Sequence, residues 1–517
     1  MDSDEANEKE AFRDHLEGIL KNTIALFYSK YIADVSLVGF GSFSSGFAMP
    51  GSDMDLAMVA NWKDFAKFLD KEETQSRVVG QISRSLEKAV LHMKMGGRSL
   101  ERTRVPILKV CQYPTETLYA ALVEEREKWE KKTTGDVSET NAQPKKAVAK
   151  NAKTDDATID ASTSPALATP TGPSSNGTNN IESKGNQPRG RTPRGREKRA
   201  GPLDFPKQGV GIQCDINFSN LVLLGIQNTH LLRCYSLTDP RVRPMVLLVK
   251  SWTKRRKINS TYSGTLSSYG WVLMVLHYLV NIAQPPVCPN LQLAGPHLKD
   301  YAQLAMFLNE PIISGHKVKF WRDEAAIKQA AQAGELTENT QSIGALLIGF
   351  FQYFSSIPGN DVAGRRQPRF HWVNDALSLR TLGGTLSKLE KGWKSAKTEV
   401  NTAKTKVTNR YLVSIEDPFE LDHNVARTVT YQGSELIRGE FKRSCRILTA
   451  IGRDLTPEGG IFDELIENPA PQTPPTPQTP KAWLEKGLKA DRKAEEESEE
   501  HGINYHSDEY PGETNVV

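Results

Sequence analysis

The sequence predicts an α+β protein in two lobes, a small unit with a mixed β-sheet and a larger, mostly helical unit. Three observations lead to this class. Runs of strand-forming residues bounded by Gly and Ser occupy the first part of the chain. The later part repeats apolar residues at helical spacing and has few strand signals. One strand-like run follows a long segment that is almost free of aromatic residues, so this segment interrupts the first unit.

The first unit begins with a predicted helix at 12–31, and a second helix is expected at 76–93, because apolar residues recur there at helical spacing. The Gly/Ser-rich segment 41–51 is predicted to turn, with room for a short helix. Alternating or apolar runs predict strands at 35–40, 53–60, 104–112 and 211–219. Helices of the second unit are expected at 228–235, 243–257, 267–282 and 343–355.

Composition divides the chain further. Residues 129–204 cannot bury enough apolar surface to offset chain entropy, so they are predicted to be a disordered basic insert. The Pro-rich and then acidic tail at 464–517 is predicted to be disordered for the same reason. The remaining segments are expected to form an N-terminal helix that packs on the helical unit (1–31), the small unit (32–128 and 205–227) and the helical unit (228–463).

Composition and charge exclude several other classes of protein. The 517 residues carry 66 basic and 62 acidic side chains, and 38% are hydrophobic. No apolar run approaches the roughly 20 residues of a membrane helix, so no membrane contact is expected. The five cysteines are scattered without a CxxC pair, which argues against a disulfide scaffold or structural zinc site. This cysteine usage suits a reducing compartment. We expect the cytoplasm and leave the nucleus open.

Three aspartates are the strongest chemical signal. Asp53 and Asp55 alternate along a predicted strand and therefore project to the same side. Asp215 lies on another predicted strand, where its apolar neighbours face the core and the aspartate faces away. Carboxylate oxygens are the ligands that Mg²⁺ prefers, and two such metal ions support phosphoryl transfer. We therefore predict these three residues to be catalytic and metal-binding, with Mg²⁺ as cofactor and Mn²⁺ able to substitute.

A pair of aspartates at this spacing is, by itself, more often a solvated turn or strand edge. The nearby Gly41-Ser42 turn, the strand context and the third aspartate favour the metal site instead. The turn can also offer backbone N–H groups to phosphate oxygens, as can a helix that begins there.

Several motifs occur together in a recognisable order. Phe40-Gly41-Ser42, Asp53-Met54-Asp55 and Cys214-Asp215-Ile216 resemble the DNA polymerase β-type nucleotidyltransferase superfamily. The stretches QNTHLLRCYSLTDPRVRPMVLLVKSWTKRRKIN, TLSSYGWVLMVLHYL and IEDPFELDHNVARTV resemble noncanonical poly(A) polymerases and terminal uridylyltransferases, especially the fungal caffeine-induced-death-suppressor type. The resemblance covers about residues 12–128 and 205–452. It implies a small nucleotidyltransferase domain and a helical domain with a poly(A)-polymerase-associated motif, with the nucleotide between them.

The resemblance also implies nucleotide contacts. Lys250 and Lys254, one helical turn apart, fall where relatives contact the β- and γ-phosphates. Ser268 falls at a phosphate position, and Tyr269 at a position that stacks on the base. The remaining implied contacts are Phe40, Gly41, Ser42, Asn220, Asn228 and Thr229. Taken alone, the lysines could be a solvated helix face, the tyrosine a core residue, and the Asn and Thr side chains helix caps.

Base choice is expected at His423. A histidine can donate to the O4 carbonyl of uracil, and uridylyl-transferring relatives carry a histidine in this motif. Asp417 and Glu420 are predicted to orient the pocket. The resemblance therefore implies template-independent addition of uridine from UTP to an RNA 3′ end, in RNA 3′-end processing and mRNA decay. The alternative is AMP addition from ATP by a poly(A) polymerase.

RNA is expected to bind through basic surface and through the insert, whose arginines run from Arg189 to Arg199. A solvated linker or a nuclear import signal would have the same composition. Further lysines around Trp393 could line an RNA path, although a solvated face is the plainer interpretation; they are Lys388, Lys391, Lys394 and Lys397. Arg255, Arg256 and Lys257 could likewise be solvated or touch RNA. The chain is expected to be a monomer.

Overall fold

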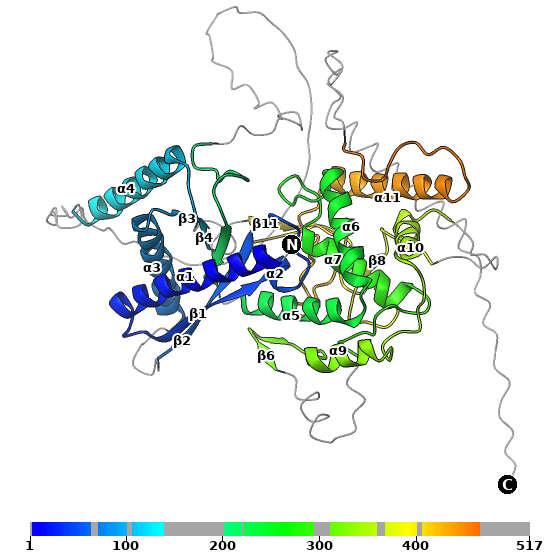
Figure 1. Cartoon of the computed structure of the whole chain (residues 1–517), viewed down its shortest axis with the longest axis horizontal. Helices are drawn as coiled ribbons and strands as arrows, with labels where there is room; N and C mark the ends of the chain where they lie inside the picture. Colours follow the sequence, from blue (N-terminus) through cyan, green and yellow to red (C-terminus); the bar gives the residue numbers. More distant parts are fainter. Residues whose placement is uncertain are drawn as a thin grey trace, which may run out of the picture. The chain divides into compact units, whose positions relative to one another are not determined.

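The computed structural model describes residues 3–63, 71–100, 106–138, 201–219, 222–293, 311–358, 368–400 and 406–465. Within these residues the predicted α+β class is confirmed (Figure 1). Most of the predicted basic insert, including Arg189–Arg199, and the tail after residue 465 lie outside the described residues. None of the described helices is both long and apolar enough to cross a membrane. All five cysteines are buried and free.

A five-stranded mixed sheet organises the first unit. Its strands lie in the order β1–β2–β5–β4–β3. They are β1 (Ile32–Phe40), β2 (Met54–Trp62), β3 (Gly96–Leu100), β4 (Ile107–Cys111) and β5 (Gln213–Asn217). β2 and β5 run parallel, and the other neighbours are antiparallel. The strand that comes last in sequence therefore lies in the middle of the sheet.

One face of this sheet is covered by α1 (Ser3–Phe27) and α3 (Lys71–His92), which pack on it and on each other. The apolar stripe of α1, including Phe12, Leu16 and Leu20, is buried with the strand residues. This corrects the expectation that the N-terminal helix packs on the helical unit. An amphipathic stripe shows that a helix is covered, but several apolar surfaces can cover it.

Helix α4 (Glu116–Ser138) packs against β3 and α3 (Figure 1). Its residues Leu118 and Leu122 are buried in a small separate cluster with Cys111. The helix continues past residue 129, where the insert was expected to begin. The boundary of the insert is therefore corrected to a later position.

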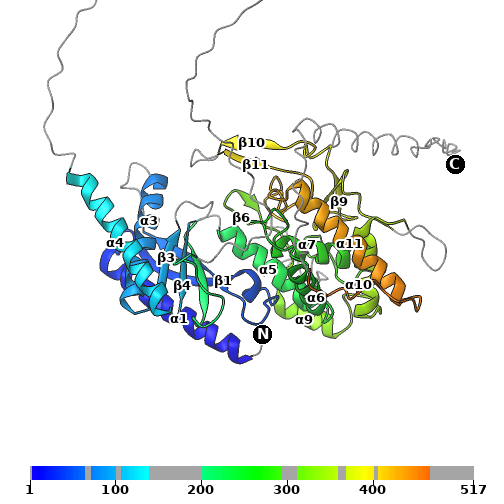
Figure 2. The ribbon, with the colours of Figure 1, turned by 90° about the horizontal axis from the view of Figure 1, so that it is seen from above.

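The helical unit has its own, larger core. Its helices are α5 (Val222–Thr238), α6 (Val242–Arg255), α7 (Ser268–His277) with a following π-helical turn (Tyr278–Ile282), α9 (Glu324–Gln332), α10 (Ile343–Ser355) and α11 (Tyr431–Ile451). Figure 2 shows α6, α7, α10 and α11 gathered together. Aromatic residues from all four helices meet there, with Trp252 in contact with Trp271, Phe351 and Phe441. Short hairpins complete the unit: β6 (Ile312–Ile313) with β7 (His316–Lys317), β8 (Asp375–Leu377) with β9 (Thr385–Ser387), and β10 (Lys397–Val400) with β11 (Lys406–Asn409).

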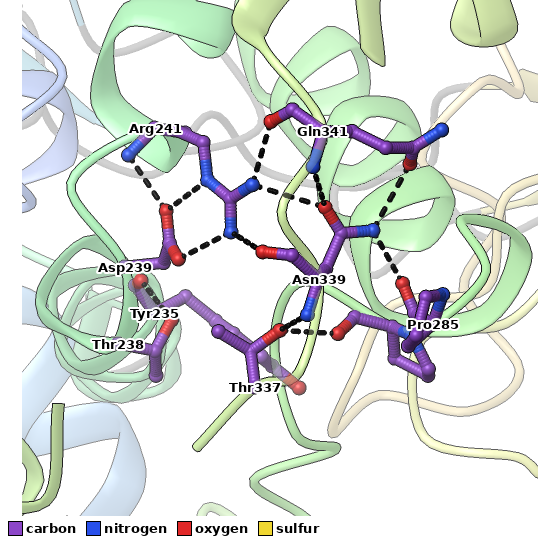
Figure 3. A network of polar contacts seen from close by, with 9 residues as sticks. Tyr235, Thr238, Asp239, Arg241, Pro285, Thr337, Asn339 and Gln341 are labelled. Carbon is purple, nitrogen blue, oxygen red and sulfur yellow. Dashed lines mark hydrogen bonds and ion pairs between the residues drawn. The ribbon is translucent and has the colours of Figure 1, made fainter. Parts of the chain in front are cut away.

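Arg241 fastens the segment ahead of α10 to the turn between α5 and α6 (Figure 3). Its guanidinium donates to the Asp239 carboxylate at 2.9 and 2.8 Å. The same group donates to the carbonyl oxygens of Asn339 and Gln341 at 2.8 and 2.7 Å. Charge-assisted bonds of this kind are among the stronger ones in proteins. The start of α10 is therefore held by a residue that precedes it by about a hundred positions.

Candidate active site

Charged residues form a row across the open face of the sheet. Asp55 on β2 is the register partner of Asp215 on β5, and Asp215 is the partner of Lys109 on β4. The residues on either side of each face the apolar core; they are Met54, Leu56, Cys214, Ile216, Leu108 and Val110. The three charged side chains therefore project to the opposite face, as the alternation predicts for Asp55 and Asp215. Asp53 directly precedes β2.

The carboxylates of this row repel one another. Burial, followed by the charges of Asp215 and Asp53, raises the pKa of Asp55 to about 7. Burial also raises the pKa of Asp53; Lys109 opposes this rise, and the charge of Asp215 adds a smaller contribution to it. Lys109 donates to both oxygens of Asp215, at 2.8 and 3.1 Å. The carboxylate row therefore favours a bound cation. In this structure the ammonium group of Lys109 supplies part of the positive charge that the row attracts.

Lys109 was not predicted as a site residue. The available signal was a single basic residue among apolar ones in Ile107-Leu108-Lys109-Val110, within the predicted strand 104–112. Alternation would have placed it on the face opposite Leu108 and Val110. What the sequence did not reveal is that β4 lies next to β5, so that Lys109 faces Asp215.

We expect Lys109→Met to lower the stability of the metal-free protein at pH 8 by roughly 1 kcal/mol, the upper range for a partly exposed ion pair. The loss should be smaller at pH 5, because protonation of Asp55 then weakens the repulsion. Urea unfolding in EDTA at both pH values measures this effect. Lys63→Met, which removes an exposed lysine just after β2, is the control. An equal loss in the two variants would show that only net charge matters.

The Gly41-Ser42 turn is built around Asp55. Gly41 has φ +73°, and a Cβ there would run into the Asp55 carboxylate, so only glycine fits. The backbone N–H of Gly41 donates to Thr229 Oγ1 at 2.8 Å, and this hydroxyl donates to the Gly225 carbonyl at 2.8 Å. The N–H of Gly41 is thus engaged within the protein, so the expected offer of backbone N–H groups to phosphate stays a prediction for the rest of the turn. Thr229 likewise supports the turn instead of presenting a free hydroxyl to the base.

The turn continues into α2 (Gly41–Ser44), in which Ser42 is half-buried. Phe40, the register partner of Asp55, lies against the start of α5 near Gly225. Helix α5 starts at Val222, so Asn228 and Thr229 are interior residues of the helix. The capping interpretation of these two residues is therefore wrong. Asn220, the third predicted contact in this region, lies outside the described residues.

Asp417 is the centre of a second cluster. It is 5% exposed and accepts hydrogen bonds from Tyr269 Oη at 3.0 Å and Asn228 Nδ2 at 3.2 Å. The backbone N–H groups of Phe419 and Glu420 also donate to Asp417 Oδ1, at 3.0 and 3.1 Å. Burial raises the pKa of Asp417, and these four donors oppose the rise. Asn228 Oδ1 is buried and has no hydrogen-bond partner among the described residues, so an acceptor remains for a ligand.

His423 belongs to the same loop. Its N–H donates to the Glu420 carbonyl at 2.8 Å, and its carbonyl accepts from the N–H of Asp417 at 3.2 Å. Its side chain is half-buried, as is that of Glu420. The structure therefore brings together Asn228, Tyr269, Asp417, Glu420 and His423. Because Asn228 contacts Asp417 while Thr229 contacts Gly41, two consecutive residues of α5 join this cluster to the carboxylate row.

The predicted phosphate-binding lysines differ in their surroundings. Lys250 is 7% exposed and donates to the Phe47 carbonyl at 2.7 Å, just after α2. Burial lowers the pKa of Lys250 to about 8, against an opposing attraction to Asp55. Lys254, one turn later, is exposed. Ser268, the first residue of α7, exchanges hydrogen bonds with Asn259 at 2.9 and 3.2 Å. Lys250 therefore lies within electrostatic range of the carboxylates, and a solvated position is excluded for it.

Two of the lysines around Trp393 are structural. Lys388 is 3% exposed and donates to the carbonyl oxygens of Trp372 and Tyr411. Lys391 is paired with Glu416 at 2.6 Å, whereas Lys394 and Lys397 are exposed. Arg256, which could have contacted RNA, forms a buried bidentate pair with Glu440 at 2.8 Å. The prediction that Lys388, Lys391 or Arg256 contacts RNA is therefore wrong.

The carboxylate row has the donors that a divalent metal needs. Among the described residues, however, no three His, Cys, Asp or Glu side chains are already arranged as a metal cage. Lys109 bonds the Asp215 oxygens instead. Burial, followed by repulsion from Asp215 and Asp53, raises the pKa of Asp55, and oxygen ligands in such a setting fit a hard cation such as Mg²⁺. The residues that could hold it are Asp53, Asp55 and Asp215.

The fold and this site resemble those of polymerase β-type nucleotidyltransferases, as the sequence motifs imply. A sequence profile of the Cid1 family of poly(A) polymerases matches residues 342–423, and one of the central palm domain of mitochondrial-like poly(A) RNA polymerases matches residues 1–119. These parts of the chain are therefore similar to the Cid1 family of poly(A) polymerases.

Named relatives differ in the nucleotide that their names imply. Terminal uridylyltransferase cid1 of Schizosaccharomyces pombe is 40% identical over 276 residues, which are 53% of this chain and 60% of that protein. Poly(A) RNA polymerase GLD2-B of Xenopus laevis is 32% identical over 234 residues, 45% of this chain and 37% of that protein. The matched regions thus span less than two thirds of these relatives.

Solved structures extend the similarity over more of the chain. A Cid1 structure described for its RNA terminal uridylyl transferase activity gives a TM-score of 0.57 at 29% identity, and the match covers 91% of this chain and 95% of that one. Cid1 bound to the UTP analogue UMPNPP gives a TM-score of 0.54 at 28% identity, covering 90% and 94%.

Proposed function

We propose that this chain is a template-independent RNA nucleotidyltransferase that adds uridine from UTP to RNA 3′ ends. The observation that carries the proposal is the carboxylate row on one sheet face, joined through Asn228 and Thr229 to the cluster around Asp417. Similarity to a terminal uridylyltransferase at 40% identity supports the choice of nucleotide. Similarity to poly(A) RNA polymerases supports the alternative, AMP addition from ATP.

In this proposal the chain's own groups bind and orient the substrates. Lys250, with a pKa of about 8, is still protonated at neutral pH and attracts the triphosphate, assisted by Lys254 and Ser268. Tyr269 is held by Asp417 and offers its ring to the base. Asn228 Oδ1 can accept a hydrogen bond from the nucleotide. These contacts hold the α-phosphate near the carboxylates, where the RNA 3′-hydroxyl displaces pyrophosphate.

Magnesium fits the carboxylate row, and Cid1 structures are described with MgATP and MgGTP. Asp53, Asp55 and Asp215 would hold it. When bound, it would activate the 3′-hydroxyl and stabilise the charge of the leaving pyrophosphate. The carboxylates must be ionised to bind metal, so the raised pKa of Asp55 makes metal affinity increase with pH up to about 7. Mn²⁺ can meet the same oxygen donors.

Primer extension tests the proposal. Purified protein, an oligo(A) RNA with a free 3′ end and Mg²⁺ are given each nucleoside triphosphate separately. We expect extension with UTP at much lower concentration than with ATP. Preference for ATP would assign the chain to the poly(A) polymerases, and no extension with any nucleotide would contradict the proposal.

His423→Asn is expected to lower the UTP-to-ATP ratio of kcat/KM by roughly fivefold, because one hydrogen bond to the uracil edge is worth about 1 kcal/mol. The kcat for UTP should change less, since His423 lies on a different element from the carboxylates. Steady-state kinetics with both nucleotides measures the ratio. Asp422→Asn, an exposed neighbour in the same loop, is the matched control. An unchanged ratio would show that base choice is made elsewhere.

The wider setting is part of the same proposal. Buried, free cysteines are consistent with a reducing compartment, for which we propose the cytoplasm. Action on mRNA decay, RNA contact through Arg189–Arg199 and a monomeric state remain predictions. Deleting 139–200 and measuring RNA affinity at two salt concentrations tests the RNA contact. A weaker salt dependence is expected in the deletion.

A further inference from the structure

Lys391 ties the loop of Asp417 and His423 to a separate part of the chain. Its Nζ donates to Glu416 Oε1 at 2.6 Å and to the carbonyl oxygen of Leu421 at 2.9 Å. Glu416 precedes Asp417, and Leu421 lies two residues before His423. One ammonium group therefore joins the beginning of the loop to the residue just ahead of the proposed base contact. We call residues 416–424 the base loop.

The two ends of the base loop, Glu416 and Asn424, are paired with each other, and we call them its foot. Leu421, which we call its tip, is held by Lys391. An isolated antiparallel bridge pairs Glu416 with Asn424. Asn424 is 2% exposed, and its side chain accepts from Ile415 and Ala426 and donates to the carbonyls of Arg410 and Val413. Leu421 is 37% exposed and lies away from this buried foot. The bond from Lys391 therefore fixes a part of the loop that its own foot does not pack.

A second cation makes the role of Lys391 separable. The carboxylate of Glu416 is 1% exposed and also accepts from Arg380 Nε at 3.0 Å and Nη2 at 3.2 Å, and from Ser378 Oγ at 2.7 Å. Arg380 and Lys391 thus both neutralise Glu416. Of these two cations, Lys391 is the one that the described structure also shows bonded to Leu421.

We propose that Lys391 is a positioning residue for nucleotide choice, which holds the tip of the base loop so that His423 meets the edge of the base. The inference rests on the function proposed above. Loss of the tether should weaken nucleotide binding and selection more than turnover, because the carboxylate row belongs to the sheet of the other unit.

Four single substitutions test this role. Lys391→Met keeps the aliphatic length and removes the donor. It is expected to raise the KM for UTP about tenfold and to lower the UTP-to-ATP ratio of kcat/KM by a similar factor. The kcat should change less than threefold. Arg380→Met removes a cation from Glu416 and leaves the tether, so its ratio should stay within about twofold of wild type. Lys394→Met removes an exposed lysine of the same turn and controls for RNA electrostatics. Lys391→Arg keeps a donor and should restore most of the selectivity.

Thermal unfolding of each variant separates folding from positioning. Equal changes of the ratio in Lys391→Met and Arg380→Met would overturn the proposal, since neutralising Glu416 would then be the whole role. A stable Lys391→Met protein with wild-type KM and ratio would also overturn it. If wild type prefers ATP, the proposed uridylyl transfer fails. The tether is then judged by the KM for ATP in the same variants, so the two failures are distinguishable.

Discussion

Asp55→Asn is expected to reduce nucleotide incorporation by at least about a thousandfold. The carboxylate is half-buried, opposite Asp215 in register and against Gly41. Its loss removes a proposed metal ligand, and metal stabilisation of transition-state charge is worth several kcal/mol, of which about 4 kcal/mol corresponds to roughly a thousandfold in rate. Single-turnover extension of labelled RNA with saturating UTP measures the loss.

The matched control for this experiment is Asp34→Asn. Asp34 is an exposed carboxylate on β1 of the same sheet, so its substitution changes the net charge equally. It should retain activity within about twofold, as surface substitutions usually do. Incorporation by Asp55→Asn at the wild-type rate would exclude the carboxylate row as the catalytic centre.

The second large effect is on stability. Without metal, wild type is expected to lose roughly 2–3 kcal/mol relative to Asp55→Asn between pH 5 and pH 8. The folded-state pKa of Asp55 is about 7 and its ordinary value is 3.8. Between these values the folded state binds more protons than the unfolded state, so stability falls as pH rises through this window and levels off above pH 7. Urea unfolding of both proteins in EDTA measures the difference.

Addition of Mg²⁺ extends this test. A cation relieves the repulsion in wild type, so millimolar Mg²⁺ should raise the stability of wild type at pH 8 more than that of Asp55→Asn. A wild-type-to-variant difference that stays constant from pH 5 to pH 8 would show that Asp55 is not forced toward its neutral form. The carboxylate row would then have no measurable cost in folding stability.

Much of the catalytic face could be predicted because strand alternation is a local property. It placed Asp55 and Asp215 away from the core, and apolar periodicity predicted the helix at 343–355 with the bounds that the structure shows. Strand β3, with the sequence GGRSL, was not predicted. Its residues have little strand preference, and pairing with β4 accounts for it.

Contacts between segments that are far apart in sequence account for the other features that the sequence analysis did not predict. Thr229 is 188 residues from Gly41 in sequence, yet its hydroxyl holds the turn. Lys391 is one of several lysines around Trp393 in sequence, and its partner Glu416 comes from a separate segment. Side-chain partners of this kind depend on tertiary packing, which single-residue patterns do not encode. The N-terminal helix was misassigned for the same reason.

The most direct measurement is extension of one RNA primer by wild type and Asp55→Asn with all four nucleoside triphosphates at equal concentration and Mg²⁺, followed by sequencing of the added 3′ ends. The account predicts tails that consist mainly of uridine from wild type and almost no tails from the variant. Tails made mainly of adenosine would contradict the assignment of UTP as substrate. Uridine tails of equal yield from both proteins would contradict the proposed catalytic centre.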